Sequence, residues 1–172
     1  MDKFIPVCEP HLSGRELEYV TDAVKTGWIS SAGSYVKEFE SQFAKICDSQ
    51  YAVGVCNGTS AIHLALKSIG IGKGDEVIIP SFTMIASAFA VCYTGAKPVF
   101  VDCDSLSWNI DESKIESKIT KKTKAIMPVH IFGLPCDMNI IQTIAKNHNL
   151  FIVEDAAEAH GAEYLSKKVG SL

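Results

Sequence analysis

A chain of 172 residues, of which 47% are hydrophobic, can bury a core of its own, and this excludes an intrinsically disordered segment. The net charge of -4 comes without a long basic run, so the charge pattern favours neither a nucleic acid nor a membrane surface as a partner. The N-terminus lacks the apolar stretch of a secretory signal and no apolar run reaches the length of a membrane span, so we expect a cytoplasmic protein.

The first 50 residues are predicted to form an N-terminal arm followed by two amphipathic helices. Ser13 and Glu16 have the spacing of a capping box with Ser13 as the N-cap, and the helix that follows them is expected to end at Gly27. The second helix is expected from about Tyr35 to Ile46, where apolar residues recur at helical spacing.

From residue 51 onward, predicted strands and helices alternate. This is the rhythm of an open, mostly parallel sheet with helices on both faces, so we predict an α/β fold with three αβα layers. Residues 51–172 are assigned to the N-terminal part of one large domain, which is incomplete. The expected strands are 51–56, 76–80, 98–103, 125–131 and 151–154, and the expected helices are 59–69, 84–93, 111–119 and 137–148.

The end of the sequence begins a hairpin, with Lys167 and Lys168 near its turn. No further element follows to cover the sheet edge. We therefore expect this sequence to be the N-terminal portion of a longer protein.

The six cysteines are scattered and form no C-x-x-C pair. We expect them to be reduced thiols, and Cys56 and Cys92 to be buried because they lie in apolar runs. The cysteine spacing does not suit a zinc site.

The segment Gly58, Thr59 and Ser60 joins an expected strand to an expected helix. Glycine lets an anion approach the backbone, the first N–H groups of a helix are unpaired and partly positive, and the two hydroxyls can donate hydrogen bonds. These properties predict a phosphate site, although an ordinary capped turn would use the same residues. The absence of a Walker or G-x-G-x-x-G motif weakens the alternative of a Rossmann-type dehydrogenase.

Asp155 follows the last apolar strand, where a buried carboxylate requires a cation or hydrogen-bond donors. The protonated pyridine nitrogen of pyridoxal phosphate is such a cation. Because ligands of open α/β sheets bind beyond the carboxyl ends of the strands, we expect Gly58 and Asp155 to face one crevice. The turn 81–87 could cover a planar cofactor or simply cap a helix, and His130 and His160 are interpreted as structural residues.

Segments in order along the chain carry a resemblance to a known family. They are 27–33, 58–61, 72–78, 95–102, 129–133 and 154–161. Together they resemble the DegT/DnrJ/EryC1/StrS sugar aminotransferases over nearly the whole chain, most closely the branch that forms GDP-perosamine. The resemblance implies a pyridoxal phosphate enzyme of fold type I, a homodimer with active sites at the subunit interface, and amino transfer from glutamate to a nucleotide-linked 4-keto-6-deoxy sugar. It also implies a role in O-antigen and lipopolysaccharide synthesis.

The resemblance also implies roles for individual residues. Asp155 would pair with the pyridinium nitrogen as the catalytic carboxylate, and the segment 58–60 would hold the cofactor phosphate. Met84 stands where the family often has an aromatic residue stacked on the ring, and Glu158 stands where many members carry glutamine near the ring oxygen. The substrate-binding residues stay unassigned.

The family's Schiff-base lysine comes shortly after a Val-Gly-Ser-Leu-like segment, which here is 169–172. That lysine is therefore absent from this sequence, since Lys167 and Lys168 precede the segment and fit an exposed hairpin. We expect the 172 residues alone to be inactive. Two alternatives remain open: a sugar dehydratase, which in this family has histidine in place of the lysine, and a truncated, non-catalytic relic.

Overall fold

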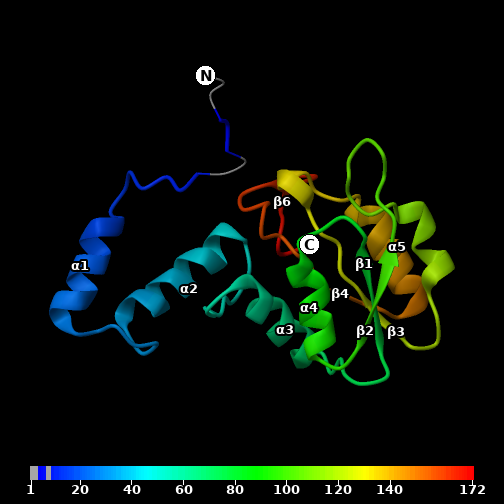
Figure 1. Ribbon diagram of the computed structural model, residues 1–172, viewed down its shortest axis with the longest axis horizontal. Coiled ribbons are helices and arrows are strands. Elements are labelled where there is room, and N and C mark those ends of the chain that lie inside the picture. The colour runs from blue at the N-terminus through cyan, green and yellow to red at the C-terminus, as the bar shows by residue number, and fades with distance from the viewer. Residues whose placement is uncertain (1–3, 7–8) are drawn as a thin grey trace.

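A parallel four-stranded sheet forms the centre of the protein, as seen in a computed structural model that describes residues 4–6 and 9–172 (Figure 1). The strand order is β2-β1-β3-β4, and each neighbouring pair is parallel. The strands are β1 (Glu76–Pro80), β2 (Lys97–Val101), β3 (Thr123–Ile126) and β4 (Phe151–Ile152). The first residues of the predicted arm and Cys8 lie outside the described residues.

Helices cover both faces of this sheet. In β1, Val77 and Ile79 pack with α3 (Gly58–Ser68) and α4 (Ile85–Tyr93), whereas Ile78 points to the opposite face and packs with α5 (Met138–His148). All three side chains are fully buried because successive residues of a strand face opposite sides and both sides are covered. The predicted three-layer αβα fold is confirmed.

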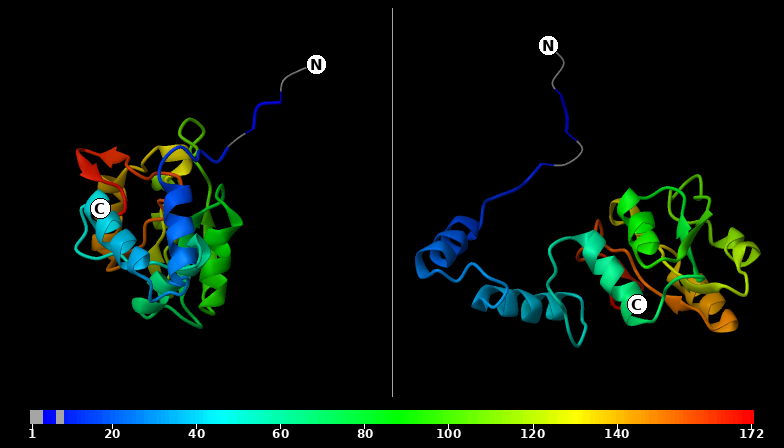
Figure 2. Two further views of the ribbon diagram at one scale, coloured as in Figure 1. Left: turned by 90° about the vertical axis from the view of Figure 1, so that its left-hand side faces the viewer. Right: turned by 60° about the horizontal axis from the view of Figure 1, so that its bottom comes forward.

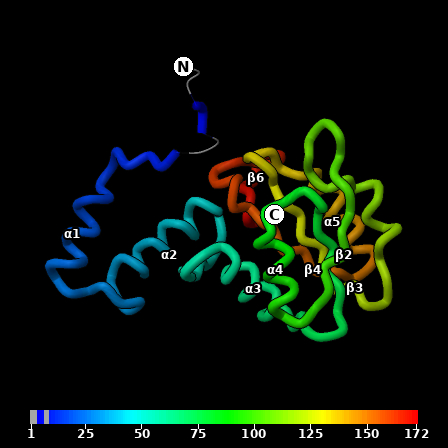
Figure 3. Tube along the Cα trace, in the orientation of Figure 1, coloured from blue at the N-terminus to red at the C-terminus, as the bar shows by residue number. Residues whose placement is uncertain are grey.

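The N-terminal helices extend away from the sheet, as two further views show (Figure 2). Helix α1 (Glu16–Thr26) contributes no buried residue and meets α2 (Ser34–Ile46) mainly through Tyr35, whose ring lies 5.2 Å from that of Tyr19. Helix α1 ends at Gly27 as predicted, with a left-handed φ of 75°. In the trace of Figure 3, α2 leads back to the sheet layer, where α3 lies beside α4.

The predicted strand 51–56 is wrong. The segment has no strand partner among the described residues, and Tyr51, Val53 and Val55 are exposed. Its Gly54 N–H donates to Glu40 Oε1 of α2 at 2.8 Å instead of to a neighbouring strand. A pattern of alternating apolar residues produces a strand only where an edge is available to pair with it.

The predicted helix 111–119 is also wrong: the segment forms two 3₁₀ turns, η1 (Glu112–Lys114) and η2 (Glu116–Lys118). Asp111 Oδ1 accepts bonds from both the N–H and the hydroxyl of Ser113, and such local side-chain bonds compete with a regular helix. A segment this short also nucleates an α-helix poorly.

Two smaller predictions are corrected as well. Ser13 does not cap α1, because its hydroxyl bonds the ring of His11 at 2.7 Å and the N-cap residue is Arg15. Cys56 and Cys92 are exposed, although the five described cysteines are all free thiols, as expected.

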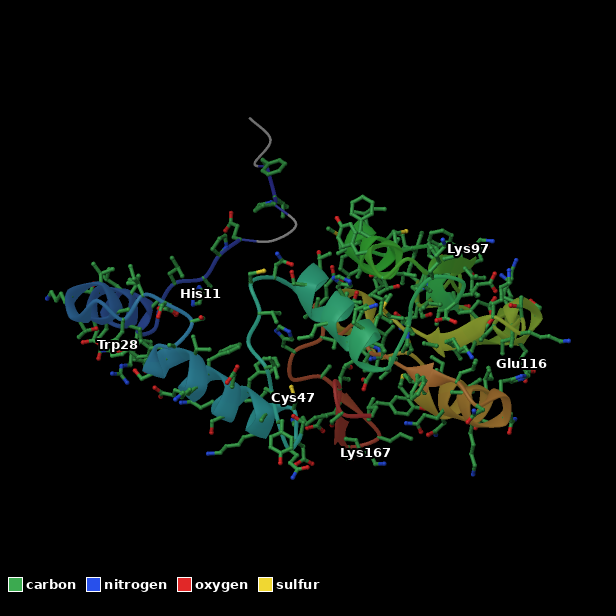
Figure 4. All side chains as sticks on the ribbon, turned by 90° about the horizontal axis from the view of Figure 1, so that it is seen from below. His11, Trp28, Cys47, Lys97, Glu116 and Lys167 are labelled. Atoms are coloured by element: carbon green, nitrogen blue, oxygen red, sulfur yellow. The ribbon has the colours of Figure 1, made fainter. Side chains whose placement is uncertain are left out.

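The C-terminal hairpin consists of β5 (Glu163–Tyr164) and β6 (Lys167–Lys168), which pair antiparallel across a turn at 165–166. Lys167 is exposed at the surface of this hairpin (Figure 4), and Lys168 pairs with Glu163. No helix in the part of the chain that the structure describes is long and apolar enough to cross a membrane.

Candidate active site

A cavity of about 660 Å³ lies between the N-terminal end of α3, the N-terminal end of α4 and the segment that follows β4. Gly58, Thr59, Met84, Asp155 and Glu158 all line it. The expectation that Gly58 and Asp155 face one crevice is therefore confirmed. Ser60, the remaining predicted site residue, is not among the lining residues, and its hydroxyl lies 3.3 Å from the sulfur of Cys56.

The N-terminus of α3 presents two free backbone donors to this cavity. Asn57 is the N-cap, and its Oδ1 accepts the N–H of Ser60 at 2.8 Å while its carbonyl accepts the N–H of Ala61. Among the described residues, no partner takes the N–H groups of Gly58 and Thr59. A Cβ added to Gly58 would meet nothing within 4 Å, so the space beside this helix end is open.

Asp155 is 8% exposed and is held from two sides. Its backbone pairs in parallel with Val129, which extends the sheet beyond β4. Its Oδ2 accepts a 2.7 Å bond from the hydroxyl of Ser87 on α4, and Ser87 in turn bonds Thr83 at 2.8 Å. Its Oδ1 is met only by a long 3.4 Å contact from the N–H of Ala157, so this oxygen keeps room for a further donor.

Glu158 lines the same cavity with a carboxylate that also supports a neighbouring loop. Its Oε2 accepts the backbone N–H of Phe132 at 2.7 Å. Phe132 belongs to the short 3₁₀ turn η3 (Ile131–Gly133) and has a left-handed φ of 50°, which bulky residues rarely adopt. Met84, the N-cap of α4, is 66% exposed and lines the cavity.

His130 and Glu154 form a buried pair beside the cavity, which Glu154 lines. The N–H of Cys136 donates to His130 Nδ1 at 3.1 Å, so the ring proton resides on Nε2, which donates to Glu154 Oε2 at 3.2 Å. Burial alone would raise the pKa of Glu154, but bonds from His130 and from the N–H groups of Gly170 and Leu172 outweigh it and lower the pKa. The structural interpretation of His130 is confirmed by this geometry.

Some residues of the site escaped the sequence reasoning. Ser87 is fully buried in α4, whose other residues are mostly apolar. A single polar residue in an apolar helix is the sequence signal that could have identified it. The sequence pattern places Glu154 only within the segment 154–161, because its hydrogen-bond partners lie 24, 16 and 18 residues away. His160 lines the cavity, and its ring centroid lies 5.5 Å from that of Phe43 of α2 in a T-shaped arrangement.

The sequence profile of the DegT/DnrJ/EryC1/StrS aminotransferase family matches residues 10–172. This chain belongs to that family. Among its relatives is the GDP-perosamine synthase of Escherichia coli O157:H7, which is 54% identical over 169 residues, or 98% of this chain and 46% of the relative. A GDP-perosamine synthase of Caulobacter vibrioides is also 54% identical. The chain thus spans about half the length of the curated relatives it matches.

A solved aminotransferase structure has the same fold. The PLP form of the sugar aminotransferase Spr1654 from Streptococcus pneumoniae superposes with a TM-score of 0.89 at 31% identity, covering 96% of this chain and 46% of that one. The fold is thus that of PLP-dependent aminotransferases of type I, and the family indicates pyridoxal phosphate (PLP) as the cofactor.

The residues present fit this cofactor. Three carboxylates, those of Glu154, Asp155 and Glu158, line the cavity, and no lysine or arginine among the described residues does so. A buried carboxylate with one under-used oxygen suits a pyridinium N–H, and a helix N-terminus with two free N–H groups suits a phosphate. The two features occupy one cavity, as a molecule with a cationic ring and an anionic arm requires.

Proposed function

We propose that the protein to which this chain belongs transfers an amino group from glutamate to a nucleotide-linked 4-keto-6-deoxy sugar, with PLP as cofactor. The observation that carries the proposal is the shared cavity of Asp155 and the free N–H groups of Gly58 and Thr59. The names of the relatives, GDP-perosamine synthases at 54% identity, support a GDP-linked sugar as the acceptor.

In this proposal each residue has a physical task. Asp155, oriented by Ser87, holds a proton on the pyridine nitrogen by offering a fixed negative charge in a site of low exposure. The N–H groups of Gly58 and Thr59 bind the phosphate through the positive end of α3, with the hydroxyl of Thr59 as a further donor. When bound, PLP supplies an electron-accepting ring and an aldehyde carbon that takes up the amino group.

The remaining cavity residues orient the ring. The thioether of Met84 would cover one face of the ring, since a polarisable sulfur packs well against a π-system. Glu158, fixed by its bond to the N–H of Phe132, would hold the ring oxygen side of the cofactor. Ser60 contributes through its place in the first turn of α3, because its N–H closes the cap on Asn57 and leaves the two preceding N–H groups for the phosphate.

The active form is proposed to be a homodimer. Helix α1 exposes Leu17, Val20 and Val24, which are 77%, 56% and 66% accessible, on one face. A second copy is the occupant we propose for this apolar stripe. The five described cysteines are free, which supports a reducing compartment such as the cytoplasm. Use of the product in O-antigen and lipopolysaccharide synthesis stays a prediction.

Absorbance spectroscopy of the full-length protein, which includes the chain expected after Leu172, tests the proposal. Glutamate added to the PLP-loaded protein is expected to shift the visible absorbance and to release 2-oxoglutarate, and GDP-4-keto-6-deoxymannose is expected to reverse the shift. Absence of any shift with glutamate would contradict aminotransfer. A sugar product that has lost a hydroxyl group without gaining nitrogen would support the dehydratase, and absence of turnover altogether would support the non-catalytic relic.

A further inference from the structure

Three hydrogen-bond donors that are distant in sequence from Glu154 converge on its carboxylate, which lines the cavity. Glu154 Oε2 accepts from His130 Nε2 at 3.2 Å and from the N–H of Gly170 at 2.9 Å. Glu154 Oε1 accepts the N–H of Leu172 at 2.8 Å. His130, Glu154, Gly170 and Leu172 are called the Glu154 network below.

The network is buried at its polar centre. The His130 side chain is 0% exposed and that of Glu154 is 7% exposed. The N–H of Cys136 fixes His130 as a donor toward Glu154, so both oxygens of the carboxylate face N–H donors and none faces an acceptor. Charge-assisted bonds of this kind are about twice as strong as neutral ones, and a buried carboxylate without them would be strongly unfavourable.

The segment held by this network forms part of the cavity wall. Val169 and Gly170 line the cavity together with Glu154 and Asp155, and Val169 is itself buried. The Cys47 sulfur at the end of α2 lies 3.8 Å from the position of a Cβ on Gly170, so the segment is also confined from the side of α2. Figure 4 shows Cys47 close to the hairpin that carries Lys167.

We propose that Glu154, oriented by His130, is a positioning residue that fixes residues 170–172 against the cavity so that the chain following Leu172 is directed to the cofactor. The proposal rests on the proposed function, because the lysine that binds PLP is expected in that following chain. Asp155 and Glu154 are adjacent and have separate tasks: Asp155 meets the cofactor ring, and Glu154 meets the backbone that presents the lysine.

The test compares Glu154→Gln with Glu163→Gln in the full-length protein. Glutamine at 154 has nearly the same shape but turns an NH₂ group toward N–H donors, so it loses acceptors and creates a donor–donor conflict. Glu163 lies on the same hairpin, and its exposed pair with Lys168 is of the kind that contributes little. The control therefore removes the same charge without touching the network.

The first readout is backbone amide exchange, which needs no cofactor. In Glu154→Gln, the N–H groups of Gly170 and Leu172 are expected to exchange at least about tenfold faster than in the wild type, which corresponds to about 1.4 kcal/mol of lost protection. In Glu163→Gln they are expected to exchange as in the wild type. Equal exchange in Glu154→Gln and the wild type would overturn the proposal.

The second readout counts the lysine bound to PLP. Borohydride reduces the carbon–nitrogen double bond between a lysine amine and the PLP aldehyde to a stable secondary amine, which mass spectrometry detects. At equal total PLP occupancy, Glu154→Gln is expected to label at least about threefold more slowly than Glu163→Gln. Equal labelling rates of Glu154→Gln and Glu163→Gln would overturn the positioning role. A wild type that does not label would overturn both the proposed function and the positioning role. In that case the amide exchange would still show whether Glu154 holds Gly170 and Leu172.

A second variant keeps the test decisive if Glu154→Gln does not fold. Glu154→Asp retains the negative charge but draws the carboxylate back by one methylene, so it no longer reaches both backbone donors. It is expected to show the same faster exchange at Gly170 and Leu172. Wild-type exchange and labelling rates in this variant would likewise overturn the proposal.

Discussion

The hydroxyl of Ser87 lies 2.7 Å from Asp155 Oδ2 and joins two segments that are 68 residues apart in the sequence. Both side chains are buried, and Thr83 continues the chain of hydroxyls from the start of α4. Asp155, the proposed partner of the pyridinium nitrogen, is thus held in place by α4. A carboxylate that is already oriented loses little freedom when a ligand binds.

Ser87→Ala is expected to destabilise the fold by about 1–3 kcal/mol, because it leaves a buried carboxylate oxygen without its donor. Urea unfolding measures the change. Ser68→Ala at the end of α3 removes a hydroxyl whose bond is to the local carbonyl of Ala65, and it should stay within about 0.5 kcal/mol of the wild type. Equal effects of the two substitutions would show that Ser87 does not support Asp155.

Gly58→Ala is expected to separate folding from cofactor binding. A Cβ at this position meets no atom, and alanine in the first turn of a helix is as stable as glycine or more stable by up to about 1 kcal/mol. The same methyl group would occupy the space proposed for the phosphate, so PLP binding should weaken by at least about tenfold in a fluorescence titration. Gly72→Ala, outside the cavity lining, is the matched control. Equal PLP affinity of the two variants would contradict a phosphate-binding role for Gly58.

The stability of the protein is expected to decrease in acid partly through Glu154. Its pKa is lowered in the folded state, so its contribution is fully present above the ordinary glutamate value of 4.5 and is lost as the pH falls through the lower folded value. Unfolding free energies should therefore differ most between the wild type and Glu154→Gln at neutral pH, and the difference should narrow below pH 4.5. A difference that is constant with pH would contradict the assigned ionisation.

Cys136 is expected to resist alkylation in the folded protein. Burial raises the pKa of its thiol to about 12, so its reactive thiolate is about one part in 10⁵ at pH 7. Peptide mapping after iodoacetamide treatment should find Cys136 modified only when urea is present. Modification in the native protein at a rate similar to that in urea would show that this side of the sheet opens readily.

Val24→Glu is expected to shift a dimer toward the monomer, because it places a charge in the exposed apolar stripe of α1. Light scattering on a sizing column gives the mass of the full-length protein. Gln142→Glu adds a similar charge on the exposed surface of α5 and should leave the mass unchanged. A mass for Val24→Glu equal to that of the wild type would exclude α1 from the interface.

Local pattern alone was enough for much of this fold. The apolar run Val77, Ile78 and Ile79 is typical of a strand covered on both faces, and this local pattern predicted β1 with its bounds. Gly27 predicted the end of α1 for a similar reason, since a left-handed residue is a local requirement. The positions of Gly58 and Asp155 at helix and strand ends likewise followed from chain order.

Tertiary structure decided what chain order leaves open. Residues 51–56 have the apolar alternation of a strand, but among the described residues they pair with no strand, and the N–H of Gly54 donates to Glu40 of α2 instead. The partners of Asp155 and Glu154 come from α4, from the loop after β3 and from the segment after the hairpin, and no spacing rule connects them. Hydrogen bonds between distant segments depend on how the layers pack, so the sequence determined which residues are available and the fold determined which of them meet.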